Sequence, residues 1–204
     1  IDTDRFDTAR TSAADGLGEK DGLRIVSVGN INPCKGYRHF IDCAARLTQR
    51  YPRLRFFIVG AEYPSQREHV RELRDLVARH GLGNLVFLGP SDRTEQVLKA
   101  CDIYVCSSVQ ESSPIALWEA MSMELPVVST MVGNVPEHVE HGKNGLLAFP
   151  VASGEVLAAQ AARLIEDGAL RARLGQEGRR MVLQRMRPDL SALRLAEFYR
   201  KLLA

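Results

Sequence analysis

Short apolar runs alternate with longer amphipathic stretches along most of the chain. Compact apolar runs, bounded by turn-forming residues, occur at 23–29, 54–60, 85–89, 103–107, 126–130 and 145–149. Runs of this kind predict buried β-strands. Because they lack the alternation of half-exposed strands, they favour a parallel sheet that is covered on both faces.

Helical periodicity fills the intervals between these runs. Apolar residues recur every three or four positions there, which predicts amphipathic helices. The predicted helices cover 37–50, 66–80, 94–100, 153–167, 169–186 and 188–203. A shorter helix is expected from Pro114, because proline fits the first turn of a helix. Ile115, Leu117 and Trp118 are expected to form its buried face. Another short helix is expected within 133–140.

The regular alternation of strands and helices predicts an α/β fold with a doubly wound, six-stranded parallel sheet and helices on both faces. Ligands of such sheets bind at the carboxyl ends of the strands, where the strand order reverses. The loops 30–36, 111–114 and 131–137 follow the first, fourth and fifth strands, so we expect them to converge there. Residues 1–22 are polar and rich in Asp and Gly, and we expect a linker without a packed element.

The composition is that of an ordinary globular protein. The 204 residues are 45% hydrophobic and 25% charged, and the net charge of +2 gives no reason to expect a nucleic-acid partner. No apolar run approaches the roughly 20 residues of a membrane span. The chain begins with Ile1 rather than Met, so we expect an upstream segment to have been removed. The cysteines show neither a CxxC motif nor metal-ligand spacing, which favours a reduced, cytoplasmic setting. They are Cys34, Cys43, Cys101 and Cys106.

Two carboxylates bracket the loop that leads into the short helix. Glu111 precedes the helix and Glu119 lies within it, and eight residues at helical rise would separate them by roughly 12 Å. The free amides of the helix start lie between them and favour an anion. A nucleotide sugar fits this arrangement, with its diphosphate at the helix start and a glutamate for the hydroxyls at each end. The alternative is a surface glutamate and an unrelated glutamate on a helix face.

Other chemistry is less well supported by the sequence. Gly29 and Gly36 fit neither a P-loop nor a dinucleotide fingerprint, which disfavours ATP hydrolysis and hydride transfer. No serine stands in a nucleophile elbow. No triad or metal-partner spacing is found among His39, His69, His80, His138 and His141.

Several motifs follow one another in a defined order: Ile1–Phe6, Val28–Gly36, Glu111–Glu119 with E-x7-E spacing, Pro126–Thr130 and Gly133–Glu137. Together they resemble the C-terminal, nucleotide-binding domain of glycosyltransferase family 4, also called glycosyl transferases group 1, over nearly the whole chain. The resemblance implies the Rossmann-like half of a GT-B fold. It also implies three parts: an interdomain linker at 1–22, a donor-binding domain at 23–187, and a C-terminal helix at 188–204 that packs toward an N-terminal acceptor domain.

The resemblance assigns a role to each matched residue. Lys35 would neutralise the donor diphosphate, Glu111 would face the donor sugar, and Glu119 would hold the ribose; Lys35 and Glu111 are thus the expected catalytic residues. The expected donor-binding residues are Gly29, Asn30, Lys35, Gly89, Glu111, Ser112, Ser113, Pro114, Ile115 and Glu119. The family transfers sugar with retention and generally without a metal, so neither a cofactor nor a metal is expected. For Lys35 the plain alternative is a solvated loop lysine.

The sequence departs from the family pattern at three places. Asn30 stands where the family usually has Arg, and it brings no charge to a diphosphate. Glu111-Ser-Ser-Pro114 replaces the common Glu-Gly-Phe-Gly, which removes one amide donor at Pro114. Asn134 stands where the family often has a second Gly, although Asn tolerates φ > 0 better than most residues.

The family implies a retaining, hexosyltransferase-like enzyme that moves a sugar from a nucleotide diphosphate sugar to a hydroxyl acceptor, in glycan or glycolipid biosynthesis. The acceptor would be a sugar, a glycan or a lipid-linked glycan, and membrane contact would come through the N-terminal domain. We expect the isolated domain to bind donor but to lack activity. Three alternatives stay open: a non-catalytic nucleotide-sugar binding module, another GT-B activity such as an epimerase or a phosphorylase, and a dinucleotide binder.

Overall fold

Six parallel strands form the centre of the computed structural model, which describes residues 1–203. Their order in the sheet is β3-β2-β1-β4-β5-β6. The strands are β1 (Arg24–Val28), β2 (Arg55–Val59), β3 (Leu85–Gly89), β4 (Ile103–Cys106), β5 (Val127–Thr130) and β6 (Leu146–Ala148). This arrangement confirms the predicted doubly wound parallel sheet.

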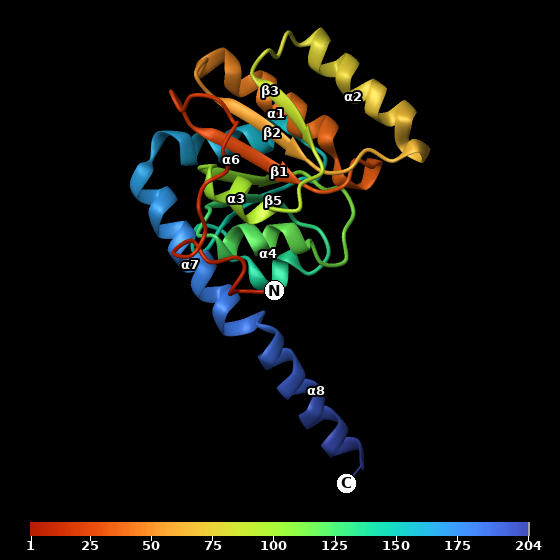
Figure 1. The fold of residues 1–204 in the computed structure, drawn as a ribbon, viewed down its shortest axis with the longest axis vertical. Helices are drawn as coiled ribbons and strands as arrows, with labels where there is room; N and C mark the ends of the chain where they lie inside the picture. Colours follow the sequence, from red (N-terminus) through yellow and green to blue (C-terminus); the bar gives the residue numbers. More distant parts are fainter. Residues whose placement is uncertain (204) are drawn as a thin grey trace.

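Helices cover both faces of the sheet (Figure 1). On one face, α1 (Tyr37–Arg50), α2 (Arg67–Arg79) and α6 (Gly154–Glu166) contribute to one apolar core. On the other face, α3 (Thr94–Lys99), α4 (Ile115–Ser122), α5 (Val135–His138) and the C-terminal part of α7 (Gly168–Arg185) contribute to a second. Successive strand residues alternate between the two cores: Ile25 belongs to the first and Val26 to the second. Each expected helix and strand is therefore present, with ends shifted by one or two residues.

The strand order reverses between β1 and β4. β1 pairs with β2 on one side and with β4 on the other, with Ile25 opposite Ile103. The chain runs outward from β1 through β3, then returns to continue from β4 through β6. The loops that follow β1 and β4 therefore meet at the switch point, where a crevice forms in such sheets.

The first 22 residues contain no helix or strand, but they are packed onto the domain. Phe6 and Leu17 are buried in the second core. The Phe6 carbonyl accepts hydrogen bonds from the Ser122 hydroxyl, at 2.7 Å, and from Arg179, at 3.3 Å. The segment thus has no helix or strand, as expected, but it is packed onto the domain, because two apolar side chains and a backbone carbonyl suffice to anchor it.

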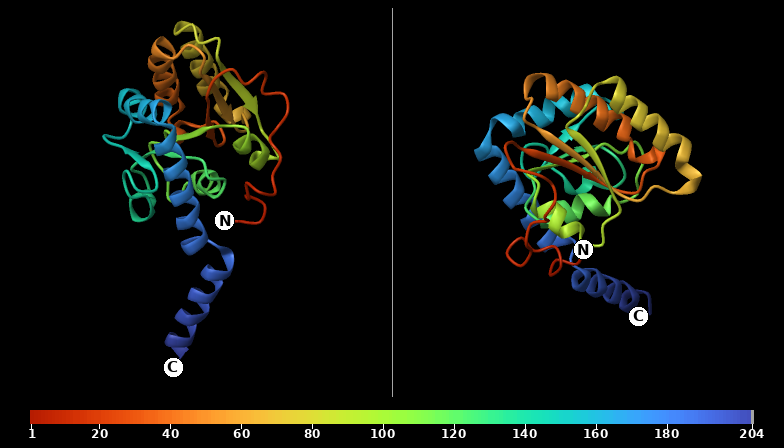
Figure 2. Two further views of the ribbon diagram at one scale, coloured as in Figure 1. Left: turned by 90° about the vertical axis from the view of Figure 1, so that its left-hand side faces the viewer. Right: turned by 45° about the horizontal axis from the view of Figure 1, so that its top comes forward.

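The last helix, α8 (Pro188–Leu203), projects away from the body of the domain (Figures 1 and 2). Its side chains include several large apolar ones that are more than half exposed: Leu193, Leu195, Phe198, Tyr199, Leu202 and Leu203. Within residues 1–203, no helix combines the length and apolar character that crossing a membrane requires.

Candidate functional site

The loop after β1 folds into a compact turn that carries Lys35. A short 3₁₀ helix, η1 (Pro33–Lys35), begins at Asn32, whose side-chain oxygen accepts from the Lys35 amide at 3.3 Å. Gly36 follows in the left-handed region, with φ of 61°, and α1 begins immediately after it. The sequence predicted a loop here, and the structure adds this 3₁₀ turn.

The loop after β4 is fastened to this turn by hydrogen bonds and by a close approach of the two backbones. The Ser107 hydroxyl donates to the Lys35 carbonyl at 2.9 Å, and the Val109 amide donates to the Cys34 carbonyl at 2.8 Å. A Cβ atom at Gly36 would lie 2.1 Å from the Ser107 carbonyl oxygen. Only glycine allows this approach and the positive φ together, so Gly36 fixes how closely the two loops meet.

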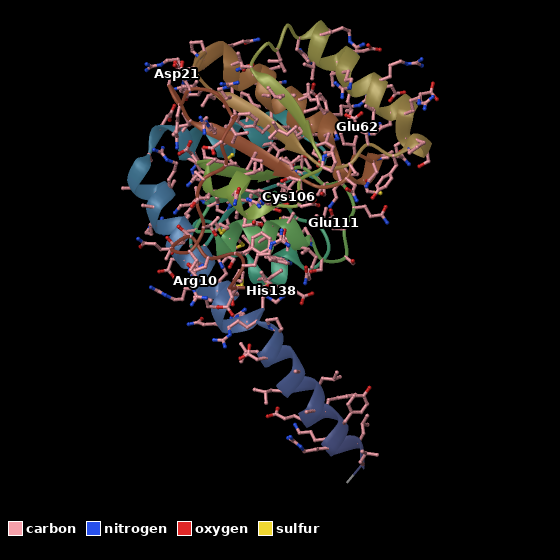
Figure 3. All side chains as sticks on the ribbon, viewed as in Figure 1. Arg10, Asp21, Glu62, Cys106, Glu111 and His138 are labelled. Carbon is pink, nitrogen blue, oxygen red and sulfur yellow. The ribbon has the colours of Figure 1, made fainter. Side chains whose placement is uncertain are left out.

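Lys35 and Glu111 form a direct ion pair across these two loops. The Lys35 Nζ lies 2.7 Å from Glu111 Oε1, and the two side chains are only 22% and 14% exposed. The Ser108 hydroxyl donates to the same Oε1 at 2.9 Å, while the Ser108 carbonyl accepts from Thr130 Oγ1 at 2.6 Å. Figure 3 labels Glu111 and also Cys106, the last residue of β4, whose thiol donates to Ser108 Oγ at 3.6 Å. The structure thus brings the two predicted catalytic residues together at the carboxyl edge of the sheet.

Gly29 lies under the Lys35 side chain. A Cβ atom at Gly29 would be 2.7 Å from Lys35 Cε, so the bare glycine backbone provides the surface over which the lysine passes. The Tyr37 hydroxyl donates to the Gly29 carbonyl at 2.6 Å, and burial raises the pKa of Tyr37 far above its usual value. Tyr37 therefore stays protonated and keeps this donor bond at any physiological pH.

Asn30 is turned toward the loop after β2. Its Oδ1 accepts from the Ala61 amide at 3.2 Å, and its Nδ2 donates to the Tyr63 hydroxyl at 3.4 Å. Gly89, at the end of β3, accepts from the Gly60 amide at 2.9 Å and has a φ of 75°. Both residues thus lie at the carboxyl edge of the sheet, but neither touches the Lys35–Glu111 pair.

The loop before α4 is held by the loop after β5. The Ser112 carbonyl accepts from the Asn134 amide at 3.0 Å, and a Cβ at Gly133 would lie 2.3 Å from that carbonyl oxygen. Ser113 Oγ accepts from the Trp118 indole at 3.1 Å. Gly133 has a φ of 52°, whereas Asn134 has a φ of −85°, so position 134 does not require a second glycine and the tolerance of Asn for φ > 0 is not used.

The helix α4 begins at Ile115, with Pro114 as its N-cap residue. The amides of Ile115 and Ala116, in the first turn, have no acceptor within the helix. Leu117 and Trp118 are buried as expected, but Ile115 is 55% exposed. The prediction that Ile115 belongs to the buried face is wrong, because first-turn residues precede the point where the helix meets the sheet.

Glu119 lies apart from the Lys35–Glu111 pair, farther along α4. Burial raises the pKa of its carboxyl above the usual value, Arg5 and the amino terminus oppose this, and Glu95 adds to it. Arg5 itself pairs with Glu95 at 2.9 Å and donates to the Asp92 carbonyl at 2.7 Å. Burial and these charges are the only influences on this pKa, and no hydrogen bond from the described residues is among them. The charged groups that act on Glu119 thus come from the N-terminal segment and α3, and Lys35 is not one of them.

Four residues that hold the site together were not among the predicted ones: Tyr37, Ser107, Ser108 and Thr130. The two serines directly follow a buried strand, which is a signal for a site at the sheet edge, but the sequence gives no indication of what they contact. Among the described residues, no cluster of three or more His, Cys, Asp or Glu side chains is arranged to hold a metal ion.

The chain is similar in sequence to known glycosyltransferases. The family model described as glycosyl transferases group 1 matches residues 10–181. N-acetyl-alpha-D-glucosaminyl L-malate synthase of Bacillus anthracis is 26% identical over 175 residues, covering 85% of this chain and 44% of that protein. D-inositol 3-phosphate glycosyltransferase of Geodermatophilus obscurus is 32% identical over 156 residues, covering 72% of this chain and 35% of that protein. The chain thus spans less than half the length of these relatives.

The chain is also similar in fold to solved structures of glycosyltransferases. The crystal structure of HepE from Anabaena in complex with UDP and glucose superposes with a TM-score of 0.87 at 25% identity, covering 98% of this chain and 54% of that one. The C-terminal domain of LpcC, a glycosyl transferase group 1 family protein from Francisella tularensis, superposes with a TM-score of 0.77 at 27% identity. That match covers 89% of this chain and 98% of the LpcC chain, so the likeness extends to a domain solved alone.

Proposed function

Because the chain belongs to the family of glycosyl transferases group 1, as the resemblance of its motifs predicted, we propose that it binds the donor of a reaction that moves a sugar from a nucleotide diphosphate sugar to a hydroxyl acceptor. The observation that carries this proposal is the meeting of Lys35 and Glu111, at 2.7 Å, beside the start of α4. A cation, free helix-start amides and a carboxylate at one sheet edge suit the diphosphate and the sugar hydroxyls of one ligand.

UDP is the nucleotide to test first. HepE, whose structure was determined with UDP and glucose, is 25% identical to this chain over almost its whole length. In our proposal the UDP diphosphate binds Lys35 Nζ and the amides of Ile115 and Ala116. The sugar hydroxyls then bind Glu111, and the ribose hydroxyls bind Glu119.

We propose transfer with retention of configuration and without a metal. The leaving diphosphate accumulates negative charge as the sugar–phosphate bond breaks. Lys35 and the first-turn amides of α4 stabilise that charge, and they accelerate the reaction only as far as they bind the transition state better than the substrate. Gly29, Tyr37 and Ser107 support this role, since they fix the backbone that carries Lys35.

The acceptor site belongs, in this proposal, to a further N-terminal domain. This chain covers 44% and 35% of the two relatives above, which leaves room in such proteins for a second domain of similar size. Residues 1–22 would connect the two domains, 23–187 would bind donor, and the apolar face of α8 would pack against the partner domain. Any contact with a membrane, for a lipid-linked acceptor, would come through that domain. We therefore expect donor binding but little or no transfer by this chain alone.

A non-catalytic sugar-nucleotide binding module is the second candidate. One observation favours it: Asn30 stands where the family usually has Arg, and its amide is already bonded to Ala61 and Tyr63. The diphosphate then meets one cationic side chain, Lys35, at this loop. A module of this kind would bind donor without transferring sugar, even in the full-length protein.

The experiment is calorimetric titration of this chain with UDP, GDP and ADP and with their common sugar conjugates. We expect selective binding of one nucleotide that is lost on Lys35→Ala, and no binding by any of them would refute the proposal for this chain. Product analysis on the full-length protein, with candidate acceptors, separates a transferase from a binding module. It also establishes the configuration of the product.

A further inference from the structure

We infer that Glu111 makes this site prefer an intact sugar nucleotide over the free nucleoside diphosphate, because it competes with phosphate for Lys35. The inference rests on the proposed function and deepens it: besides contacting the sugar, Glu111 sets the selectivity of the site against its own product. The starting observation is the direct pair between Lys35 Nζ and Glu111 Oε1.

This ion pair is better fixed than an ordinary surface pair. Both side chains are largely shielded from solvent, and the loops that carry them are fastened to each other through Ser107 and Val109. The side chains therefore lose little further entropy on pairing, and solvent screens their attraction less than at the surface. Any phosphate group that binds Lys35 has to displace the Glu111 carboxylate or share the lysine with it.

The cost of this displacement differs between the two ligands. A sugar nucleotide supplies hydroxyl groups that can donate to Glu111, so the carboxylate exchanges one partner for another. A free nucleoside diphosphate supplies no such donor. Its terminal phosphate also carries more negative charge at neutral pH than an esterified one, and Glu111 repels it more strongly. The same carboxylate thus favours the donor and disfavours the product.

Ser108 would keep the Glu111 carboxylate in place while Lys35 exchanges it for a phosphate group. Its hydroxyl donates to Glu111 Oε1 at 2.9 Å independently of Lys35, and its backbone is tied to β5 through Thr130. When Lys35 moves to phosphate, this bond still orients the carboxylate toward the sugar. After the sugar has left, Glu111 can recapture Lys35, which assists release of the nucleoside diphosphate. Ser108 is in this sense a positioning residue for Glu111.

The test compares UDP and UDP-glucose binding by calorimetry in this chain and in three variants. Glu111→Gln removes the charge and keeps the shape, and we expect it to bind UDP about tenfold more tightly, whereas its affinity for UDP-glucose does not rise. Glu140→Gln makes the same change at a surface pair, Glu140–Lys143, whose side chains are 59% and 64% exposed; both affinities should stay at the wild-type values. Ser108→Ala should weaken UDP-glucose binding about fivefold and leave UDP binding nearly unchanged.

The outcomes separate this inference from the proposed function. If wild type binds UDP and Glu111→Gln binds it no more tightly, the inference is overturned and the donor site stands. Equal tightening toward both ligands would also overturn it, because selectivity would be unaffected. If wild type binds none of UDP, GDP, ADP and their sugar conjugates, the proposed function itself fails; if it binds GDP or ADP instead, the same comparison is made with that nucleotide and its glucose conjugate. Should Glu111→Gln not fold, as judged by thermal unfolding, Ser108→Ala decides: an unchanged preference for UDP-glucose over UDP overturns the inference.

Discussion

Glu111 and Glu119 belong to the same motif, yet their carboxylates lie in different surroundings. Glu111 is bound by Lys35 and Ser108 within a fastened pair of loops. Glu119 lies half-buried on α4, where burial raises the pKa of its carboxyl and no hydrogen bond from the described residues offsets that burial. The protein therefore satisfies the Glu111 carboxylate itself and gives the Glu119 carboxylate no comparable partner among the described residues.

If the donor binds as we propose, this difference gives the two glutamates distinct roles in binding. At the Lys35 end, a ligand has to replace the bond between Lys35 and Glu111. Binding there would therefore depend on whether the ligand supplies an anion for Lys35 and hydrogen-bond donors for Glu111. At the Glu119 end, ribose hydroxyls would add hydrogen bonds to a carboxylate that has lost water without gaining a partner. In our proposal, the Lys35 end would therefore discriminate among ligands, and the Glu119 end would contribute affinity for any nucleoside.

The largest expected effect comes from breaking the junction of the loops at the Lys35 end. Gly36→Ala forces a Cβ to within 2.1 Å of the Ser107 carbonyl oxygen at a φ of 61°, and we expect a loss of about 3 kcal/mol in the free energy of unfolding. Gly81→Ala is the matched control, because Gly81 has a φ of 64° and no atom within 4 Å of the added Cβ. It should cost only about 1 kcal/mol. Urea unfolding measures both, and equal losses would mean that the close contact is unimportant.

Removing the cation is the next largest change. Lys35→Ala should weaken UDP binding by about thirtyfold, because the lysine is the cationic group placed for the diphosphate. Lys143→Ala, which removes the lysine of the exposed pair with Glu140, should leave binding as it is. Calorimetry measures UDP binding by both variants. If Lys35→Ala binds UDP as tightly as wild type does, the diphosphate does not bind at Lys35.

At the other end, Glu119→Gln should have opposite effects on binding and on stability. It should weaken UDP binding roughly fivefold, since an amide accepts ribose hydroxyls less well than a carboxylate. The raised pKa of Glu119 means that ionising this group costs more in the folded state than in the unfolded state. This cost appears as the pH rises through the ordinary value of 4.5 and above, and is absent where the group is protonated in both states.

The stability of Glu119→Gln therefore depends on pH in a defined direction. Near pH 7 the variant should melt roughly 1–3 °C above wild type, and at pH 4 the difference should shrink toward zero. Differential scanning calorimetry at the two pH values measures this. A variant that is less stable than wild type at pH 7 would mean that Glu119 has a favourable partner in the folded protein.

The smallest expected effect tests whether a second positive charge near Lys35 strengthens UDP binding. Asn30→Arg adds a positive charge next to Gly29 and should tighten UDP binding about threefold at low salt, with the gain fading as salt increases. Asn30→Met removes the amide bonds to Ala61 and Tyr63 without adding charge, and so isolates the contribution of the charge. A gain of equal size in both variants would show that the charge is not responsible.

Much of the fold was predictable because it depends on local patterns. The helix α1 was predicted at 37–50 and occupies Tyr37–Arg50, since its apolar residues recur with strong helical spacing and Gly36 and Pro52 bound it. The six strands were visible because strands buried on both faces are continuously apolar. The exposed Ile115 and the buried Phe6 were not predictable from pattern, since their environments depend on where the helix and the N-terminal segment meet the rest of the domain.

The order of the helices and strands, the doubly wound class and the sheet edge that carries Lys35 and Glu111 were all predictable from the sequence, because the apolar period and the order of the motifs carry this information. Which of the predicted site residues meet was visible only in the folded chain. Lys35 and Glu111 are 76 positions apart, and their 2.7 Å contact depends on β1 and β4 becoming neighbours and on Gly36 admitting the Ser107 carbonyl. Neither condition leaves a local signature, since each depends on backbone atoms brought together from distant parts of the chain.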